Sequence, residues 1–524
     1  MSQKRDKKPD VLIILSDQHR ASITGCYGDP VVRTPNIDRL AAEGALFEQA
    51  YCPLPVCAPS RMSLMTGRYP HDIECWDNAS PLASDIPTFA HALGIAGYEV
   101  VFNGRAHWNG PDQRHGFKDR LVGDISPSYW GGGSGEWWVR VKDKTYLTGM
   151  EGHYRPAVTL FSGPGWSQYL EYDNVVLEAA LKFIGDRSTQ SDRDPFCLVV
   201  GLMSPHYWFT CPQEDYDLYD GKIDTLLLPD DHPESLHPFN REMVIAADLE
   251  SIPREDVIRT RTAYYGLVTF TDRMIGQLVD AVEHNGLKDN TLTLYSTDHG
   301  EMAGEHGMWW KHNFYEGASH IPLIVSFPGR LPQGKRVVEP VSLVDVFPSL
   351  CDWTGAPPPP KLAGRSLDPL IKGEKWPEER AVFSELYRRF PGESAVVARM
   401  VRQGAWKYNY YHGQASEMFN MEEDPREFHN VAEDPAYGDV RSKLEKLVME
   451  GWNPEEILPK LREFKQRVEY LEQWTRAVNP PDPDQWEGMK PPFPDEWSQN
   501  ALSLPEYAEW ANLQKTQRAP RNGK

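Results

Sequence analysis

The sequence contains no long apolar stretch. A helix that crosses a bilayer needs about 20 consecutive apolar residues, and runs such as 11–15 are far shorter. The polar N-terminus leads straight into that run, which is also too short for the apolar part of a signal peptide. We therefore expect a cytoplasmic protein with no membrane partner.

Basic residues are also few relative to acidic ones. The chain has 55 Lys and Arg against 76 Asp and Glu, which gives a net charge of −21. Such a surface repels nucleic acids and anionic lipid surfaces, so we expect no nucleic-acid partner. A pocket that binds an anion would have to concentrate positive charge against this background.

Cysteines are scarce as well, with seven in 524 residues. An odd number in a chain of this size indicates reduced thiols rather than a disulfide framework. The remaining composition, 40% hydrophobic and 25% charged, is that of a globular protein. The length is sufficient for two or three domains with a sizeable core.

Short apolar runs alternate with helix-like segments in the first two thirds of the chain. Apolar runs that predict strands lie at 11–15, 98–102, 196–202, 291–296 and 322–326, and helical patterns lie at 35–43, 57–66 and 259–285. This alternation predicts an α/β fold, with a mostly parallel sheet sandwiched between helices.

The pattern changes after Gly355 and the prolines at 357–360. Beyond them, 397–402 and 406–410 are typical of antiparallel strands, and 440–449 and 454–473 are typical of helices. We therefore predict a main α/β domain over 8–375 and a smaller C-terminal α+β subdomain over 376–478. The segment 479–524, rich in Pro, Trp and Asp, is predicted to be an extended arm on the body or on a neighbouring molecule.

Polar side chains follow four of the predicted strands. In an open parallel sheet, ligands gather at the carboxyl ends of the strands. One polar residue after a strand is ordinarily a turn signal, but four such groups in one sheet favour a common crevice. The groups are Asp17-Gln18-His19, Arg105 with His107, His206 after Pro205, and Asp298-His299.

Part of this set has the chemistry of a metal site. Asp17, Gln18, Asp298 and His299 offer oxygen atoms and one nitrogen, which suits Ca²⁺, Mg²⁺ or Mn²⁺. The set is poor for structural zinc, which prefers Cys and His at short spacing. A turn hydrogen bond is the alternative interpretation for Gln18.

Cys57 opens the run Cys57-Ala58-Pro59-Ser60-Arg61. Pro59 fits the first turn of a helix, whose positive end would point at residue 57. Arg61 would add a fixed cation one turn on, so the place suits an anionic nucleophile or an anionic substrate. For this run alone, a buried cysteine that only packs is the better interpretation.

Taken together and in order, these segments resemble the sulfatase family within the alkaline phosphatase superfamily. The resemblance covers about residues 8 to 450 and implies an alkaline-phosphatase-like fold. The segments that carry it are 16–18, 57–61 with 66–68, 104–107, 205–206, 297–301, 304–307 with Lys311, 402–408 and 418–425.

The resemblance implies hydrolysis of sulfate monoesters by an unusual nucleophile. A separate formylglycine-generating enzyme would oxidise Cys57 to formylglycine, whose hydrate attacks sulfur and later expels sulfate through its second hydroxyl. The metal ligands would be Asp17, Gln18, Asp298, His299 and residue 57. A binding protein with an unmodified Cys57 is the non-enzymatic alternative.

The resemblance also implies roles for the other residues. Arg61 would hold the two hydroxyl groups of the formylglycine hydrate and neutralise negative charge nearby. Lys311, Arg105 and the metal would clamp the sulfate oxygens. His206 is the candidate general acid for the leaving oxygen, and His107 would deprotonate the second hydroxyl. Either histidine would otherwise be a core residue bonded to the backbone.

Some positions depart from the usual sulfatase pattern. Gln18 and His299 stand where sulfatases usually have Asp and Asn, which resembles the choline sulfatase and phosphonate monoester hydrolase branch. In that branch Asn78 would contact substrate, and the C-terminal arm would join copies into a homo-oligomer. The metal would then be Ca²⁺ or Mn²⁺, because imidazole favours the softer ion.

The same departures leave an alternative function open. A phosphonate monoester or a phosphodiester would be hydrolysed at the same site. Arg105 and His107 argue against the phosphonate alternative, because they resemble the pair found at these positions in sulfatases. Arg105 stands in place of the usual lysine, and a guanidinium stays charged, so it would clamp rather than transfer a proton.

Tryptophan is abundant, with 17 residues. If they line the pocket, we expect an aryl, sugar or quaternary ammonium leaving group. Core packing is an equal alternative for each one singly. Five tryptophans lie next to the motifs: Trp76, Trp108, Trp208, Trp309 and Trp310.

Overall fold

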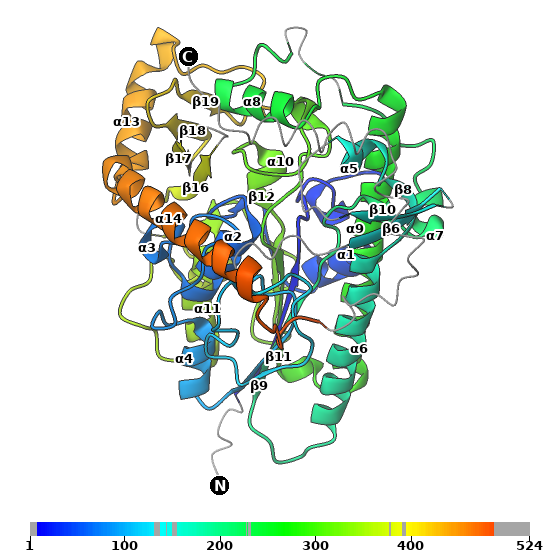
Figure 1. Ribbon diagram of the computed structural model, residues 1–524. Coiled ribbons are helices and arrows are strands. Elements are labelled where there is room, and N and C mark those ends of the chain that lie inside the picture. Colours follow the sequence, from blue (N-terminus) through cyan, green and yellow to red (C-terminus); the bar gives the residue numbers. More distant parts are fainter. Residues whose placement is uncertain are drawn as a thin grey trace.

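An eight-stranded sheet forms the centre of the molecule (Figure 1). The computed structural model describes residues 8–129, 137–142, 144–148, 155–226, 228, 232–376, 379–389 and 395–486. The strand order is β14-β2-β13-β11-β1-β9-β4-β5. Among the described residues, β13 is the one strand of this sheet that runs antiparallel to its neighbours. The prediction of a mostly parallel sheet is therefore confirmed. The bounds are β1 (Asp10–Ser16), β2 (Ala45–Phe47), β4 (Glu99–Gly104), β5 (Asp119–Arg120), β9 (Phe196–Gly201), β11 (Thr291–Thr297), β13 (Leu323–Ser326) and β14 (Lys335–Val337).

Helices cover both faces of this sheet. Successive side chains of β1 point to opposite faces, so Leu12 and Ile14 pack in one core cluster while Val11, Ile13 and Leu15 pack in another. The first cluster includes side chains of α1 (Pro35–Ala42), α6 (Gln168–Ser188) and α9 (Arg254–His284). The second includes α2 (Cys57–Thr66), α4 (Phe89–Ile95) and α11 (Val346–Thr354). Burial on both faces explains the uninterrupted apolar run in the sequence.

Several short elements were not predicted. Two small sheets have the orders β10-β8-β6-β7 and β12-β3-β15. Segments this short carry too little periodicity to be detected in a sequence. Their bounds are β3 (Ala50–Tyr51), β6 (Trp137–Val141), β7 (Lys144–Thr148), β8 (Gly163–Ser167), β10 (Thr210–Cys211), β12 (His320–Ile321), β15 (Val341–Ser342), α3 (Pro70–Ile73), α5 (Pro156–Thr159), α7 (Gln213–Asp217), α8 (Pro238–Ala246), α10 (Glu316–Ser319) and α12 (Asp368–Ile371).

The C-terminal region forms a separate antiparallel sheet of order β16-β17-β18-β19 with two helices. The predicted α+β character is confirmed for β17 (Ala395–Gln403), β18 (Trp406–Tyr411), α13 (Gly438–Val448) and α14 (Pro454–Val478). β16 (Val382–Arg389) and β19 (Glu417–Asn420) were missed, since Glu385 and the arginines of β16 interrupt its apolar pattern. The domain boundaries at 375 and 478 stay a prediction.

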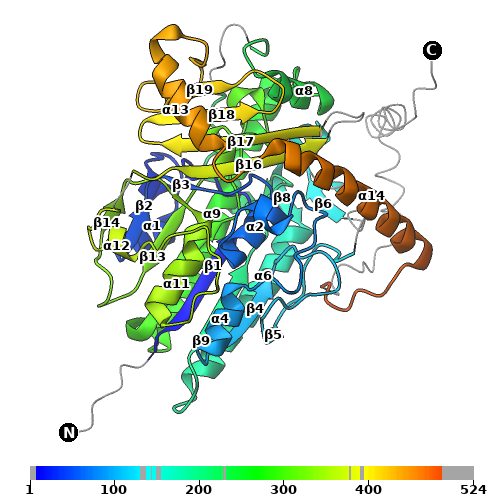
Figure 2. The same ribbon diagram turned by 90° about the vertical axis from the view of Figure 1, so that its left-hand side faces the viewer.

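The two faces of β17 pack against different partners. Val396, Ala398 and Met400 belong to the main core cluster that also contains α9. On the other face, Val397 packs with α14, and Val401 packs with α13. The C-terminal sheet therefore shares a core with the α/β region, and a separate cluster packs α14 against Leu54, Val56 and Trp76 of the main body (Figure 2).

The chain continues beyond α14 into the predicted arm. Residues 479–486 are described, and they lie against residues 123–128 of the same chain. Residues 487–524 are outside the described part, and the prediction that the arm joins copies of the chain stays a prediction.

None of the described helices combines the length and the apolar character that crossing a bilayer requires.

The shared core predicts that the C-terminal sheet contributes to the stability of the whole molecule. Met400 is fully buried in it, so Met400→Ala should lower the free energy of unfolding by about 2–5 kcal/mol. The measurement is urea denaturation followed by circular dichroism. The control is Ile245→Ala, because Ile245 is 52% exposed and its loss should change the value by about 0.5 kcal/mol or less. Equal effects of the two substitutions would contradict the shared core.

Candidate active site

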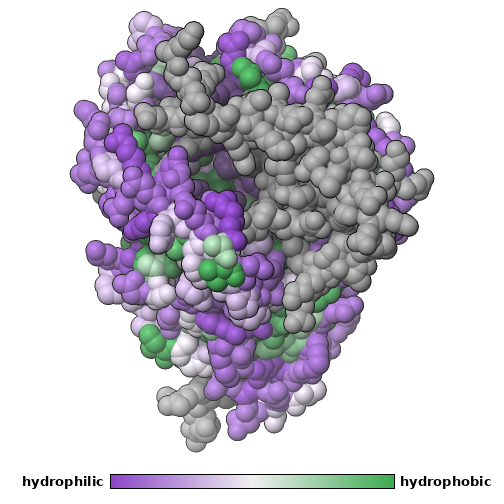
Figure 3. Space-filling view, viewed as in Figure 1, coloured by the Kyte–Doolittle hydropathy of each residue, from purple (hydrophilic) through white to green (hydrophobic). Residues whose placement is uncertain are grey.

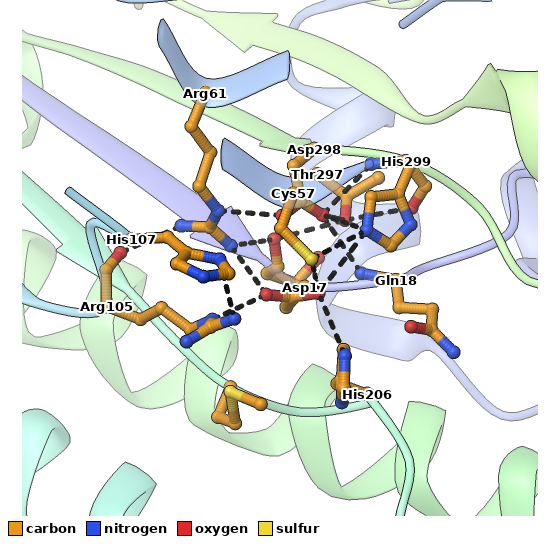
Figure 4. Close-up of polar contacts among 12 residues, drawn as sticks. Asp17, Gln18, Cys57, Arg61, Arg105, His107, His206, Thr297, Asp298 and His299 are labelled. Atoms are coloured by element: carbon orange, nitrogen blue, oxygen red, sulfur yellow. Dashed lines mark hydrogen bonds and ion pairs between the residues drawn. The ribbon is translucent and has the colours of Figure 1, made fainter. Parts of the chain in front are cut away.

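The polar groups that follow β11, β1, β9 and β4 meet at one edge of the sheet (Figure 4). These four strands are neighbours in the sheet, so the residues after them lie side by side although they are far apart in sequence. Cys57, at the start of α2, lies among them. These polar groups therefore converge in space as the sequence predicts.

Four ligand atoms come together around Cys57. Asp17, Cys57, Asp298 and His299 each place one donor atom within 4.8 Å of the others. Cys57 Sγ lies 3.2 Å from His299 Nε2 and 3.7 Å from Asp17 Oδ1. Ligands of one divalent ion lie about 2.0–2.6 Å from it and hence roughly 3–4 Å apart. These residues fit a shared metal ion.

His299 has the form that a metal ligand requires. Its Nδ1 lies 3.0 Å from Gly300 O, and a carbonyl only accepts, so Nδ1 carries the proton and the Nε2 lone pair faces the cluster. Burial lowers the pKa of His299 to about 4, although Asp298 opposes the shift, so the ring is neutral at pH 7.

The two carboxylates are surrounded by cations. Arg61 Nε donates to Asp298 Oδ2 at 2.7 Å, and its Nη2 lies 3.2 Å from Asp17 Oδ2. Arg105 Nε also donates to Asp17 Oδ2, at 2.7 Å. Burial alone would raise the pKa of Asp17, but Arg105, Arg61 and Lys311 hold it well below its usual range. Arg61 thus neutralises both candidate ligands.

Cys57 is 1% exposed and opens α2 as predicted. Burial and then the charge of Asp17 raise the pKa of its thiol to about 11, although Lys311 opposes the shift. An unmodified Cys57 is therefore a neutral thiol at pH 7 and a poor nucleophile. Asn78 secures this helix start, because its Oδ1 accepts from the backbone N–H of Ala58 at 3.0 Å.

Lys311 and His206 form a pair beside Cys57. Lys311 Nζ lies 2.9 Å from His206 Nε2 and 3.2 Å from Cys57 Sγ. His206 Nδ1 faces Tyr207 O, so Nδ1 carries the proton and Nε2 accepts from Lys311. Burial and then Lys311 lower the pKa of His206 well below its usual value. In this arrangement the lysine holds the proton that the pair can give up.

His107 differs from the sequence-based assignment as a base. Arg105 Nη2 lies 3.0 Å from His107 Nδ1, and a guanidinium only donates. Nδ1 therefore accepts, and the proton of the neutral ring is on Nε2. Burial and then Arg105 lower the pKa of His107 well below its usual value. The geometry favours a hydrogen-bond donor at Nε2 over a proton acceptor.

The side chain of Gln18 turns away from the cluster of metal donors (Figure 4). Its Nε2 donates to Glu301 Oε2, and its Oε1 accepts from Lys311 Nζ at 2.7 Å. The structure thus brings four of the five predicted ligands together and holds the Gln18 amide between Glu301 and Lys311. Because both ends of the amide are engaged, Gln18 orients the lysine here.

Buried carboxylates also fix the backbone that carries these side chains. Gln18, His107 and Trp310 have φ values of 66°, 58° and 68°, a left-handed conformation that is strained in residues other than glycine. Asp298 accepts from the N–H of Gln18 at 3.1 Å, Asp124 from that of His107 at 2.7 Å, and Glu301 from that of Trp310 at 2.6 Å.

A fourth carboxylate supports the segment before His206. Asp173, on α6, accepts from the N–H groups of Met203 and Ser204 at 2.6 and 2.8 Å. Sequence reasoning missed Asp173 and Asp124, because neither is near a motif. Glu301 stands within the motif 297–301, and that position was the signal available for it.

A cavity of about 510 Å³ borders the site. It lies between the loop 76–79, β16 and α14, and it reaches Val56 and His312, the neighbours of Cys57 and Lys311. Its wall includes Asn78, Tyr387, Arg388, Phe464 and Glu469. On the face shown in Figure 3, the visible hydrophobic side chains form small separate patches.

Aromatic side chains line this cavity, but most of the tryptophans beside the motifs are not among them, since Tyr387 and Phe464 contribute instead. Of the five tryptophans beside the motifs, Trp76 lines this cavity. The other four are among the largest fully buried side chains and pack within the core: Trp108, Trp208, Trp309 and Trp310. Core packing therefore accounts for these four.

Comparison with known proteins identifies related sequences. The family model described as Sulfatase matches residues 9–356, and that of the N-sulphoglucosamine sulphohydrolase C-terminal region matches 304–452. Choline-sulfatase of Rhizobium meliloti is 32% identical over 450 residues, which cover 82% of this chain and 83% of that protein. Arylsulfatase K of Danio rerio is 28% identical over 461 residues, covering 84% and 83%.

Solved structures share the fold. The phosphonate monoester hydrolase of Agrobacterium radiobacter superposes with a TM-score of 0.69 at 23% identity, covering 87% of this chain and 96% of that chain. A 2-O GAG sulfatase gives a TM-score of 0.65 at 23% identity, covering 88% and 94%. Because the Sulfatase model spans residues 9–356 and the similarity to choline-sulfatase extends over 82% of this chain, the protein belongs to the sulfatase family and is a sulfuric ester hydrolase.

Proposed function

We propose that this protein hydrolyses sulfate monoesters with a formylglycine derived from Cys57. The observation that carries the proposal is the place of Cys57, whose Sγ lies within hydrogen-bonding reach of His299 and Lys311 and faces Asp17. The raised pKa of the thiol supports it, because an unmodified Cys57 would react poorly at neutral pH. A formylglycine-generating enzyme would be the maturation partner.

The aldehyde would solve a chemical problem of this site. Its hydrate would supply one hydroxyl to attack sulfur and a second hydroxyl whose deprotonation later expels sulfate. A serine or threonine in the same place would offer no such internal route to release. Residue 57 is enclosed by Asp17, His299 and Lys311, so the neighbouring groups needed to orient such a nucleophile are already in place.

Asp17, Asp298, His299 and residue 57 would hold one divalent metal ion. Two carboxylates with a neutral imidazole suit Mn²⁺ or Ca²⁺, and the imidazole favours Mn²⁺. Such an ion would lower the pKa of the nucleophilic hydroxyl and polarise the sulfate oxygens. The fit rests on the 3.2–3.7 Å spacing of Cys57 Sγ from two other donors.

The chain's own cations would bind the sulfate group. Arg61 is engaged by Asp17 and Asp298, so its role is to balance those carboxylates. Arg105 and Lys311 would clamp the sulfate oxygens, which carry the charge that shifts in the transition state. His107 would add a donor at Nε2, next to Arg105.

The proton for the leaving oxygen would come from Lys311 and His206 acting together. Lys311 donates to His206 Nε2 in the structure, so His206 would hold the ammonium in place while another of its protons passes to the alcohol oxygen and leaves a neutral amine. The alcohol itself would occupy the cavity of about 510 Å³ beside Asn78 and α14.

Replacing the nucleophile should abolish activity. We expect Cys57→Ala to lower kcat for an aryl sulfate by about 1000-fold or more, because residue 57 is the group that we propose attacks sulfur. The control Cys26→Ala, at a partly exposed cysteine, should keep wild-type turnover. Mass spectrometry of the peptide with residue 57, from the native host, should show an aldehyde. An intact thiol in fully active protein would refute the formylglycine mechanism.

Removing the metal should also abolish activity. A chelator should reduce turnover of an aryl sulfate to background, and Mn²⁺ or Ca²⁺ should restore it, because the nucleophile depends on the ion. Asp298→Ala should lose bound metal, measured by elemental analysis, whereas Asp192→Ala, at an exposed carboxylate, should retain it. Full activity in protein free of divalent metal would contradict this assignment.

The runner-up function is hydrolysis of a phosphonate monoester or a phosphodiester at the same site. His299 supports it, since a histidine at this position resembles the branch that contains choline sulfatases and phosphonate monoester hydrolases. We nevertheless expect kcat/KM to be higher for 4-nitrophenyl sulfate than for a phenylphosphonate ester, because Arg105 and His107 form a sulfatase-like anion clamp. If the phosphonate is preferred by orders of magnitude, the runner-up is correct.

A further inference from the structure

Two side chains in the loop 123–128 hold Arg105 and His107, the pair that we name the anion clamp. Asp124 Oδ2 accepts from the backbone N–H groups of Ala106 and His107 at 2.8 and 2.7 Å. Ser126 Oγ accepts from Arg105 Nη1 at 2.5 Å. The positions of Arg105 and His107 therefore depend on where Asp124 and Ser126 lie.

This loop is in turn held by a segment from the other end of the chain, residues 482–486, which we name the C-terminal strap. Asp124 N–H donates to Asp484 O at 3.0 Å, and Trp486 N–H donates to Asp124 O at 2.7 Å. Ser128 N–H donates to Asp482 Oδ2 at 2.7 Å. These bonds bracket the two residues that hold the clamp.

Close packing adds to the hydrogen bonds. The ring of Trp486 packs edge-on against Tyr172, with centroids 5.2 Å apart, and Tyr172 donates to Gly123 O at 2.7 Å. A Cβ at Gly123 would lie 2.2 Å from Asp484 O. Position 123 must therefore be glycine for the strap to lie where it does.

The body of the protein also holds this loop, because Ile125 is fully buried in the main core cluster and Gly110 N–H donates to Ser128 O at 2.7 Å. The strand before it, β5, pairs with β4 over only two residue pairs in the described structure. His107 has a left-handed backbone, with φ of 58°, and such a conformation persists only where surrounding contacts impose it. Asp124 supplies such a contact to the N–H of His107, and the strap contacts Asp124 and Ser128 from residues more than 350 positions away in the sequence.

We propose that residues 482–486 are a positioning element of the active site, which holds Asp124 and Ser126 and through them Arg105 and His107. The inference rests on the proposed function, in which Arg105 and His107 bind the sulfate group. The strap touches no reacting atom. Its effect is the orientation of the anion clamp, and a misplacement of about 1 Å in such a group lowers turnover by about 100-fold.

The first test perturbs the interface from the loop side. Gly123→Ala would displace the strap through Asp484 O, whereas Gly94→Ala has nothing within 4 Å of its Cβ. Neither glycine has positive φ, so neither substitution forces an alanine into a left-handed backbone. We expect Gly123→Ala to lower kcat for 4-nitrophenyl sulfate about 10- to 100-fold and to weaken inhibition by inorganic sulfate. Gly94→Ala should leave both unchanged.

The second test perturbs the interface from the strap side. Asp482→Ala removes the acceptor for Ser128 N–H, while Asp482→Asn keeps a side-chain oxygen there. Turnover and sulfate inhibition should fall in the alanine variant and largely return in the asparagine variant. The rates are normalised to the concentration of protein that carries both formylglycine and metal. The thermal unfolding midpoint of each variant is measured as well.

A double-mutant cycle isolates the contact. In a chain that ends at Val478, the strap is missing, so Gly123→Ala should add no further loss of kcat. An equal loss in the full-length and shortened chains would overturn the proposal. If the shortened chain does not fold, the Asp482→Ala and Asp482→Asn pair decides.

The outcomes separate this inference from the proposed function. If Gly123→Ala and Asp482→Ala lower the unfolding midpoint but leave kcat and sulfate inhibition unchanged, the strap is only structural and the inference fails. If Arg105→Ala lowers kcat while the strap variants do not, the proposed function stands and the inference alone fails. If Arg105→Ala leaves kcat unchanged, the assignment of the clamp fails and the inference with it.

Discussion

The balance of buried charge is the constraint on which the active site depends. Asp17 is fully buried and Asp298 is 2% exposed, and a buried carboxylate is stable only when it is paired and hydrogen-bonded. Arg61 pairs with both. Together with Arg105 and Lys311, it gives the site more cations than these two carboxylates neutralise. A protein with a net charge of −21 thereby presents a local positive site to an anionic ester.

The same chemistry makes the site rigid. Asp124, Asp173 and Glu301 accept from backbone N–H groups next to Arg105, His206 and Lys311, respectively. The carboxylates satisfy donors that would otherwise be buried without partners, and they hold strained turns at the ends of the strands. The cations are thus in place before substrate binds, which is the condition for effective electrostatic stabilisation of a transition state.

The C-terminal region takes part in the site in two ways. α14 forms one wall of the cavity that would receive the alcohol, and the C-terminal strap contacts the loop behind Arg105. α14 packs there with Leu54, Val56 and Trp76 of the α/β region, whereas Met400 of the C-terminal sheet packs in the main core cluster. α14 and residues 482–486 therefore place C-terminal side chains beside the cavity and the loop behind Arg105.

The sequence by itself determined the fold class and the members of the site. Runs buried on both faces, such as 11–15, identify parallel strands, and polar residues directly after them must meet at one edge, so Asp17, Arg105, His206 and Asp298 were found without a structure. Tertiary structure alone decided the orientation of Gln18, the tautomers of His107 and His206, and the supporting roles of Asp124 and Asp173. Each of these depends on a hydrogen-bond partner outside the local sequence pattern, as when Asp173 reaches residues 203 and 204. The local sequence pattern determines which face of a strand or helix a side chain lies on. Its hydrogen-bond partner is determined only when distant segments of the chain pack together.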